Sequence, residues 1–406
     1  MTCRMCRGVS LEPFLDLGFS PPADQFRRKD QLREPEVWYP LQVLMCECGL
    51  AQLSHVVSPE VLYRNDYPYE SSTTRMGREH WDRFAGAVVQ RFSLGADDLV
   101  VDIGSNVGVL LNAFSSRGVR VQGVDPAANI VLIAVRNGVD TLCDFFNAET
   151  VRAITAAKGQ ASVVTATNVF AHVDDLHKFM RDVQSLLRPG GVFIFEAPYF
   201  QNLVDKVEYD TIYHEHLSYL SMRPLVPFFS QFEMEVFHVE FVDIHGGSFR
   251  VFVGGRGEHA VTPEVAELLS REQERGLQSP EALSRFALAV EQNRRDLTWL
   301  LHSLKHEGKR IAGVSAPAKG MTLINYCRIG PEILDFVTEK AALKIGRFTP
   351  GSRIPVVSDQ VLLDQGADYA LLLAWNFAEE IMSNLSAFRA RGGKFIIPIP
   401  HPTVIG

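Results

Sequence analysis

A short segment near residue 100 has the residue types that bind a nucleotide-like cofactor. Val100–Val109 reads VVDIGSNVGV, in which Asp102 ends an apolar run and is followed by Gly104 and Gly108. Glycines allow a tight turn and let a cofactor approach backbone atoms that a Cβ would block. A dinucleotide-binding turn instead has the spacing G-x-G-x-x-G. The charge of Asp102 would repel a pyrophosphate but suit the ammonium group of a methionine, so we predict S-adenosylmethionine (SAM) rather than NAD.

Further polar residues follow the later strands of the same region. Asp125-Pro126 ends the second predicted strand, where an acid can accept hydrogen bonds from both ribose hydroxyls. Asp144-Phe145 follows the third strand and can offer a carboxylate to the adenine amino group beside an aromatic ring. Asn168–His172 leaves the fourth strand toward cofactor and substrate. The predicted cofactor-binding residues are Asp102, Gly104, Ser105, Asn106, Gly108, Asp125, Pro126, Asp144, Phe145 and Asn168.

Four of the six cysteines lie near the N-terminus, as the pairs Cys3-x-x-Cys6 and Cys46-x-Cys48. Zinc binds four thiolates in a tetrahedron, and two close pairs joined by a loop can supply them. The second pair is tighter than the usual C-x-x-C, and two pairs of ordinary reduced thiols are the alternative. We predict a structural zinc rather than a catalytic one, because four cysteines close the coordination sphere.

A third cluster, Tyr213-His214-Glu215-His216, places a hydroxyl, bases and an acid side by side. Histidine takes up a proton near neutral pH, and a neighbouring carboxylate can fix its tautomer and raise its basicity. An extended segment would also let the two histidines bind a metal, although the zincin pattern H-E-x-x-H is absent. A polar surface turn with chance histidines is the remaining alternative.

Alternating helices and apolar strands must position these residues. Such alternation predicts a parallel, doubly wound sheet, with antiparallel partners added at residues 235–242 and 248–253. A long helical region over 263–306 precedes a second, smaller alternation. The first sheet is predicted from strands at 99–103, 121–124, 162–165 and 192–195 and helices at 127–136 and 174–187, the last ending in the stop and turn Arg188-Pro-Gly-Gly. The second is predicted from strands at 310–314, 335–338, 369–374 and 394–398 and a helix at 320–327.

The size and composition fit a multidomain globular protein. A chain of 406 residues is longer than a single hydrophobic core usually accommodates, so we expect two or three domains. We predict an α/β fold with a zinc-binding domain at 1–70, a Rossmann-like SAM domain at 71–254 and a Rossmann-like α/β domain at 255–406. The net charge of −8 argues against a nucleic-acid partner. The N-terminus does not resemble a signal peptide and no apolar run is long enough to span a membrane, so we expect a cytoplasmic protein. The sequence does not fix the oligomeric state, and we favour a monomer.

Nearly the whole chain resembles the sugar C-methyltransferases, which methylate a ring carbon of a nucleotide-linked deoxysugar. This family has a zinc-binding N-terminal domain, a central SAM domain and a C-terminal α/β domain that contributes to sugar-nucleotide binding. The segment Thr338–Lys344 departs from the family, since it lacks the Asp-Asn-Pro expected before the Gly-Arg motif. The resemblance is carried by Tyr67–Ser72, Tyr213–Tyr219, His245–Arg250, Ala318–Gly320, Asn325–Cys327 and Gly346–Gly351.

The resemblance implies that His216 is the general base that forms an enolate beside a 4-keto group. Glu215, His214 and Tyr213 would orient it and stabilise the enolate, which takes the methyl group of SAM. Lys319 and Arg347 would suit the diphosphate of a dTDP-linked sugar, and Tyr69 and Tyr326 would add hydroxyl or stacking contacts. The implied setting is deoxysugar and antibiotic biosynthesis, with methylation at carbon 3 or carbon 5. Methylation of oxygen or nitrogen in another small molecule, or a non-catalytic SAM- or zinc-binding role, are the alternatives.

Overall fold

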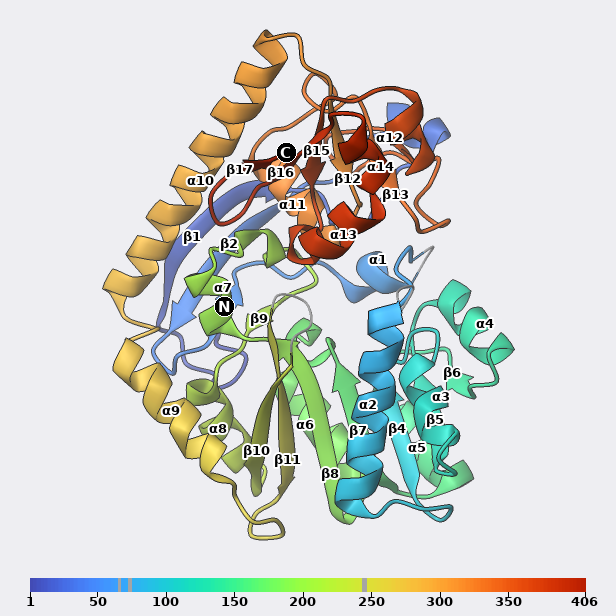
Figure 1. Ribbon diagram of the computed structural model, residues 1–406. Helices are drawn as coiled ribbons and strands as arrows, with labels where there is room; N and C mark the ends of the chain where they lie inside the picture. The colour runs from blue at the N-terminus through green and yellow to red at the C-terminus, as the bar shows by residue number, and fades with distance from the viewer. Residues whose placement is uncertain (65–66, 72–74, 243–246) are drawn as a thin grey trace.

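The computed structural model describes residues 1–64, 67–71, 75–242 and 247–406, and these residues are built around three β-sheets (Figure 1). The α/β class is as predicted, with a small N-terminal sheet, a central SAM-type sheet and a C-terminal α/β sheet. Among the helices within these ranges, none is both long and apolar enough to cross a membrane.

The N-terminal sheet is antiparallel and has the order β1-β2-β3-β9. Its fourth strand, β9, comes from far along the chain and directly follows the Tyr213–His216 cluster. Ala51 and Gln52 of β3 pair with Tyr219 and Ser218 of β9, so this sheet anchors the end of the cluster. The strands are β1 (Leu11–Ser20), β2 (Tyr39–Cys46), β3 (Ala51–Leu53) and β9 (Ser218–Tyr219), and the short helices are η1 (Lys29–Arg33) and α1 (Pro59–Tyr63).

The central sheet has seven strands in the order β10-β11-β8-β7-β4-β5-β6. The strands from β8 to β6 are parallel, and β11 and β10 add to β8 in antiparallel fashion, as the sequence predicted. The chain order reverses between β7 and β4, the kind of position where open α/β sheets bind ligands at the strands' carboxyl ends. The strands are β4 (Leu99–Ile103), β5 (Arg120–Val124), β6 (Thr141–Leu142), β7 (Ala161–Thr167), β8 (Leu187–Pro198), β10 (Met234–Val242) and β11 (Ser248–Gly255).

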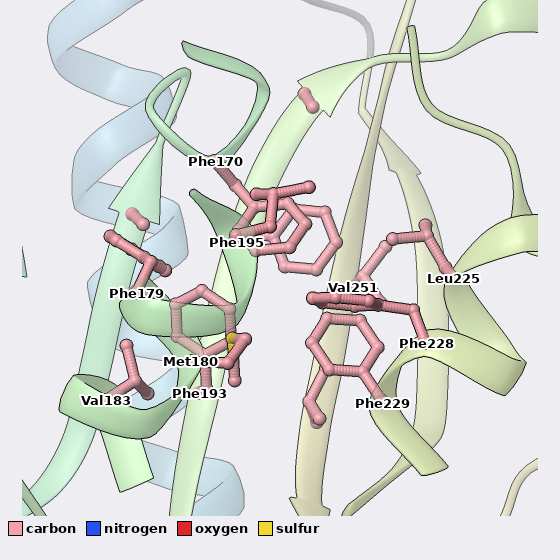
Figure 2. Packing of buried hydrophobic residues seen from close by; sticks show 14 of the residues in the cluster. Phe170, Phe179, Met180, Val183, Phe193, Phe195, Leu225, Phe228, Phe229 and Val251 are labelled. Carbon is pink, nitrogen blue, oxygen red and sulfur yellow. The ribbon is translucent and has the colours of Figure 1, made fainter. Parts of the chain in front are cut away.

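Helices cover both faces of this sheet because its strands are apolar on both sides. Neighbouring residues of a strand point to opposite faces, so Val100 packs in one buried cluster and Val101 in another. One cluster joins the sheet to α2 (Arg75–Phe92), α3 (Val109–Ser115) and α4 (Ala128–Arg136). The other joins it to α5 (Ala148–Lys158), α6 (Leu176–Leu186) and α8 (Met222–Ser230). Figure 2 shows its aromatic centre, where Phe170 lies 4.6 Å from Phe195 between ring centroids.

The C-terminal sheet has the order β14-β13-β12-β15-β16-β17, and only β17 runs antiparallel to its neighbour. This confirms the second α/β alternation. Its strands are β12 (Ile311–Val314), β13 (Val337–Glu339), β14 (Val356–Ser358), β15 (Tyr369–Leu372), β16 (Lys394–Ile397) and β17 (Thr403–Ile405). The remaining helices are η2 (Phe170–His172), α7 (Phe200–Asp205), η3 (Tyr209–Thr211), α9 (Pro263–Arg275), α10 (Pro280–His306), α11 (Ala318–Tyr326), α12 (Gln360–Asp364), η4 (Trp375–Phe377), α13 (Ala378–Asn384) and α14 (Ser386–Ala390).

One local prediction was wrong. The stretch Arg188-Pro-Gly-Gly is not a turn but the beginning of β8, which starts at Leu187 as soon as α6 ends. The predicted helical region over 263–306 is confirmed at both ends and consists of two helices, because Gly276 takes a left-handed conformation with φ +56° and Ser279 caps α10.

Candidate active site

The cofactor turn lies at the carboxyl end of β4, where three residues take left-handed backbone conformations. Gly104, Asn106 and Gly108 have φ values of +67°, +49° and +81°. A Cβ on Gly104 would lie 2.4 Å from Cγ2 of Val169, and one on Gly108 would lie 2.6 Å from Cγ2 of Val139. Both positions therefore require glycine, one to let the η2 segment approach and one to begin α3.

Two buried carboxylates face this turn. Asp102 accepts a hydrogen bond from Oγ1 of Thr165 at 2.6 Å. Burial raises its pKa to about 7; the Thr165 hydrogen bond opposes that shift, and the charge of Asp125 adds to it. Asp125 accepts hydrogen bonds from the backbone amides of Asn106 and Ala127, each at 2.9 Å. A buried acid with a raised pKa is suited to a cationic ligand such as the ammonium group of SAM, and Asp125 lies where ribose hydroxyls are expected.

Asn106 attaches the segment before α2 to the turn. Its Oδ1 accepts from the amide of Ser71 at 2.8 Å, and its Nδ2 donates to the carbonyl of Tyr69 at 3.1 Å. Asn129 repeats this arrangement with the backbone of Tyr67. The predicted substrate residue Tyr69 therefore lies against the cofactor turn.

A cavity of about 930 Å³ opens at this end of the central sheet. It brings together residues from the predicted cofactor-binding, catalytic and substrate-binding groups. Those that line it are Asp102, Gly104, Ser105, Asn106, Asp125, Pro126, Phe145, Asn168, Tyr69, Tyr213, Glu215, His216 and Lys319.

Apart from the four predicted zinc ligands, five predicted site residues do not line this cavity: Gly108, Asp144, His214, Tyr326 and Arg347. Asp144 is half exposed and forms an ion pair with Arg64 at 3.3 Å instead of facing the cavity. Tyr326 lines a separate cavity of about 990 Å³, where Cζ of Arg294 lies 4.9 Å from the centroid of its ring. The neighbour of Arg347, Phe348, exchanges two backbone hydrogen bonds with Arg27, so the Gly346–Gly351 motif holds the N-terminal segment.

His216 is a buried histidine that lines the cavity, and a backbone carbonyl orients its ring. Its Nδ1 donates to the carbonyl of Thr211 at 2.7 Å, which leaves the lone pair on Nε2. The ring of Tyr213 lies 4.1 Å from that of His216 between centroids. We expected the adjacent Glu215 to fix the tautomer of His216. In the structure the Thr211 carbonyl does so instead.

Glu215 and His214 have other surroundings. Burial raises the pKa of Glu215 well above its usual value; the charge of Asp24 adds to the shift and that of Lys344 opposes it. His214 turns toward the N-terminal sheet, where its ring lies 5.8 Å from that of Tyr39. Burial lowers the pKa of His214 to about 4, so it is neutral near pH 7.

A second histidine, His172, lies beside His216 in the lining of the cavity. The rings of His172 and His216 lie 5.1 Å apart between centroids, and the ring of Tyr63 stacks on His172 at 6.1 Å. Burial lowers the pKa of His172 well below its usual value, and the nearby His216 lowers it further. The sequence pointed to the Asn168–His172 stretch but did not single out His172.

Two lysines of the C-terminal α/β unit reach the same cavity, each paired with a buried acid. Nζ of Lys319 lies 3.5 Å from Oδ2 of Asp210 and 4.1 Å from the centroid of the Trp375 ring. Nζ of Lys344 donates to Oδ1 of Asp24 at 3.1 Å and to the carbonyl of Ala316 at 2.8 Å. Lys344 lies in the segment noted only as a departure from the family, and Asp24 had no signal in the sequence.

Behind the turn, a buried ion network stiffens the wall of the cavity. Nε of Arg250 donates to Oε1 of Glu196 at 2.6 Å, and Nε2 of His80 lies 3.1 Å from Oε2 of the same carboxylate. The backbone carbonyl of Glu196 accepts from the amide of Asn168 at 2.8 Å. Arg250 belongs to the His245–Arg250 motif, of which His245 and Gly246 lie outside the described residues, as does Ser72 of the Tyr67–Ser72 motif.

The four N-terminal cysteines converge as predicted. Sγ of Cys3 lies 3.6 Å from Sγ of Cys48, and Sγ of Cys6 lies 3.5 Å from Sγ of Cys46. All four sulfur atoms lie within 4.8 Å of one another. Thiolates about 2.3 Å from a zinc ion are about 3.8 Å apart, so this set fits one tetrahedral zinc despite the tight C-x-C pair.

Comparison with known proteins covers nearly the whole chain. A zinc binding domain matches residues 3–63, a methyltransferase domain matches 78–239, and a C-methyltransferase C-terminal domain matches 243–400. The C-methyltransferase NovU of Streptomyces niveus is 37% identical over 405 residues, which is 99% of this chain and 96% of NovU. A ubiquinone biosynthesis O-methyltransferase of Methylobacterium sp. (strain 4-46) is 33% identical over 95 residues, 23% of this chain and 38% of that protein.

Solved structures match the central part of the chain. A S-adenosylmethionine-dependent methyltransferase from Clostridium acetobutylicum ATCC 824 has a TM-score of 0.36 and 14% identity, covering 44% of this chain and 92% of that one. Magnesium protoporphyrin IX methyltransferase from Synechocystis PCC 6803 has a TM-score of 0.35 and 14% identity, covering 44% and 82%.

Proposed function

This chain belongs to the C-methyltransferase family, and from that premise we propose that it methylates a ring carbon of a nucleotide-linked 4-keto-deoxysugar, with His216 as the general base. It is a SAM-dependent methyltransferase with a zinc-binding domain. The observation that carries the proposal is the buried His216, oriented through Nδ1 by Thr211, in one cavity with the cofactor turn.

The reaction needs a base, because a ring carbon is not nucleophilic by itself. A carbon next to a ketone can lose a proton to Nε2 of His216, which leaves an enolate and an imidazolium. Bound SAM supplies the electrophilic methyl group that this carbon accepts. The Tyr213 hydroxyl and a protonated Glu215 are the groups we assign to the enolate oxygen, because both line the cavity and can donate a hydrogen bond.

The cavity also offers contacts for the sugar nucleotide. Lys319 and Lys344 are cations that the C-terminal α/β domain contributes to the cavity, and this domain is expected to meet the diphosphate. Tyr69 and the neighbouring Tyr67 present aromatic rings near the cofactor turn. Arg347 and Tyr326, which were expected to serve here, lie outside the cavity, so we assign their roles to Lys344 and Tyr67.

The experiment is solvent exchange of the substrate's ring protons. The protein is incubated in deuterated water with a dTDP-4-keto-6-deoxy sugar, with and without SAM, and the ring protons are followed by NMR. We expect selective exchange at one carbon, either carbon 3 or carbon 5, and a gain of one methyl group when SAM is present. His216→Asn should abolish the exchange, whereas His214→Asn, the same change on a side chain outside the cavity, should retain it.

Two results would contradict the proposal. Methyl transfer to oxygen or nitrogen without ring-proton exchange would favour the alternative methyltransferase chemistry. Neither exchange nor methyl gain across a panel of sugar nucleotides would exclude this substrate class. Deoxysugar and antibiotic biosynthesis, the setting that the family resemblance implies, is a further part of the proposal.

A further inference from the structure

Arg4 lies between two of the zinc-ligand cysteines, yet its side chain points away from them into the protein. The side chain is 4% exposed. Its Nη1 donates to the carbonyls of Leu53 at 3.1 Å and Leu217 at 3.2 Å, and its Nε donates to Oδ1 of Asp174 at 3.0 Å. One guanidinium thus joins three segments that are far apart in the sequence.

Two of these segments carry His172 and His216, two of the histidines that line the cavity. Leu217 directly follows His216, and Asp174 lies two residues after His172 and itself lines the cavity. The rings of His172 and His216 are 5.1 Å apart, so small shifts of either segment change this distance. The planar guanidinium of an arginine presents its donors in a rigid, fixed geometry, whereas the three donors of a lysine ammonium rotate on a flexible stem.

The other end of Arg4 is fixed by the zinc knuckle, which we define as Cys3–Gly8 together with Cys46–Gly49. The backbone amide of Arg4 donates to Oε1 of Gln52 at 2.9 Å. The carbonyl of Met5 accepts from Nε2 of His177 on α6 at 2.8 Å. The knuckle is therefore bound to β3 and to α6, and the backbone from which the Arg4 side chain extends is held in place.

We propose that Arg4 is a positioning residue, whose guanidinium holds the segments bearing His172 and His216 at a fixed separation and ties that separation to the zinc knuckle. This inference rests on the proposed role of His216. It gives the N-terminal zinc domain a part in catalysis without contact with the reacting atoms.

The test compares Arg4→Met with Arg7→Met, the same change on an exposed arginine of the same knuckle. Four quantities are measured: zinc content, the Kd for SAM, kcat with the ring-proton exchange rate, and the NMR resonances of the histidine ring protons. His172→Asn and His216→Asn variants assign those resonances.

For Arg4→Met we expect full zinc content and an unchanged Kd for SAM, since the hydrogen bonds that hold Asp102 and Asp125 come from Thr165, Asn106 and Ala127 and not from Arg4. The values of kcat and of the exchange rate should fall together, by up to about a hundredfold, because a displacement of about 1 Å has that effect on reacting groups. The resonances of His172 and His216 should shift or broaden. Arg7→Met should change none of these.

An Arg4→Met protein with unchanged resonances and wild-type exchange would overturn the proposal. If Arg4→Met does not fold, Asp174→Leu decides, because it removes the acceptor of Arg4 Nε while the 60% exposed Asp174 lies outside the knuckle. Loss of that one bond should slow exchange by up to about tenfold, and an unchanged rate would overturn the proposal. If the wild type exchanges no sugar nucleotide, the proposed function fails, while the histidine resonances still test Arg4.

Discussion

Replacing Asp102 by asparagine should stabilise the protein in the absence of SAM, and more strongly at higher pH. Asp102 is 2% exposed at the end of β4. Burial is the main cause that raises its pKa from 3.8 to about 7, with the Thr165 hydrogen bond opposing and the charges of Asp125 and Glu196 adding. Between these two pKa values the folded protein holds a proton that the unfolded chain has lost, so stability falls as pH rises.

The magnitude follows from the size of the shift. A difference of about three pKa units corresponds to at most about 4 kcal/mol once the pH exceeds the folded-state value, for example at about pH 7.5. At about pH 5 the pH is only about one unit above the unfolded-state pKa, so burying Asp102 lowers the free energy of unfolding by only about 2 kcal/mol. Asparagine has nearly the same shape and can accept the Thr165 hydrogen bond, so the variant should gain these amounts over the wild type.

Urea denaturation of the ligand-free protein at the two pH values measures this difference. Asp98→Asn is the control, because burial acts to raise the pKa of Asp98 but hydrogen bonds from Ser162 and Gly95 and the charge of Arg188 lower it overall. Its replacement should destabilise the protein. A gain for Asp102→Asn that does not grow between the two pH values would refute the reasoning.

The same substitution should weaken SAM binding, measured by calorimetry. The lost carboxylate would have accepted a charge-assisted hydrogen bond, which contributes about 1.5–3 kcal/mol, so the Kd should rise about ten- to hundredfold. Stability and binding should therefore change in opposite directions, as expected for a buried charge retained for a cationic ligand.

Three further predictions concern other parts of the chain. Cys48→Ser should release the zinc and lower the melting temperature, measured by metal analysis and thermal unfolding, because it leaves three thiolates. Lys319→Met should raise KM for the sugar nucleotide about tenfold, whereas Arg347→Met should change it much less, because only Lys319 lines the cavity. Glu196→Gln should destabilise the protein by about 1–3 kcal/mol in thermal or urea unfolding, since the buried Arg250 loses the charge of Glu196 but keeps its ion pair with Glu240.

Each has a matched control and a contradicting result. Cys143→Ser, an exposed cysteine outside the cluster, should leave zinc content unchanged. Glu233→Gln, which loses an exposed ion pair with Arg256, should cost less than about 1 kcal/mol. Full zinc retention in Cys48→Ser, equal KM values in the two cation variants, or equal stability losses in the two glutamate variants would each contradict the assignment.

The sequence predicted those features that depend on local patterns. Apolar runs marked the central strands because both of their faces are buried, and Leu99–Ile103 matches β4 at both ends. The glycines of the cofactor turn were recognisable because no other residue suits their backbone and close contacts. The cysteine pairs were recognisable because zinc ligation imposes a small set of spacings.

Features that depend on distant segments could not be predicted in this way. The pairing of β3 with β9, and the bond between Lys344 and Asp24, join residues separated by more than a hundred positions. Nothing in the local sequence distinguishes Lys344, which lines the cavity, from Arg347, which does not. Likewise, the acid beside His216 suggested that Glu215 orients it, whereas the fold brings the Thr211 carbonyl to Nδ1.

The segment 209–217, which carries His216, is held from every side by other parts of the chain. Asn293 of α10 accepts from the Tyr209 hydroxyl at 2.8 Å, and Thr322 of α11 donates to the carbonyl of Ile212 at 3.2 Å. Leu53 of the N-terminal sheet donates to the carbonyl of Leu217 at 3.0 Å. A base on such a segment keeps its position only while both flanking units are folded and docked. If His216 is the base, as we propose, the small zinc domain and the C-terminal α/β domain contribute to catalysis by holding this segment, in addition to any contact that they make with the substrate.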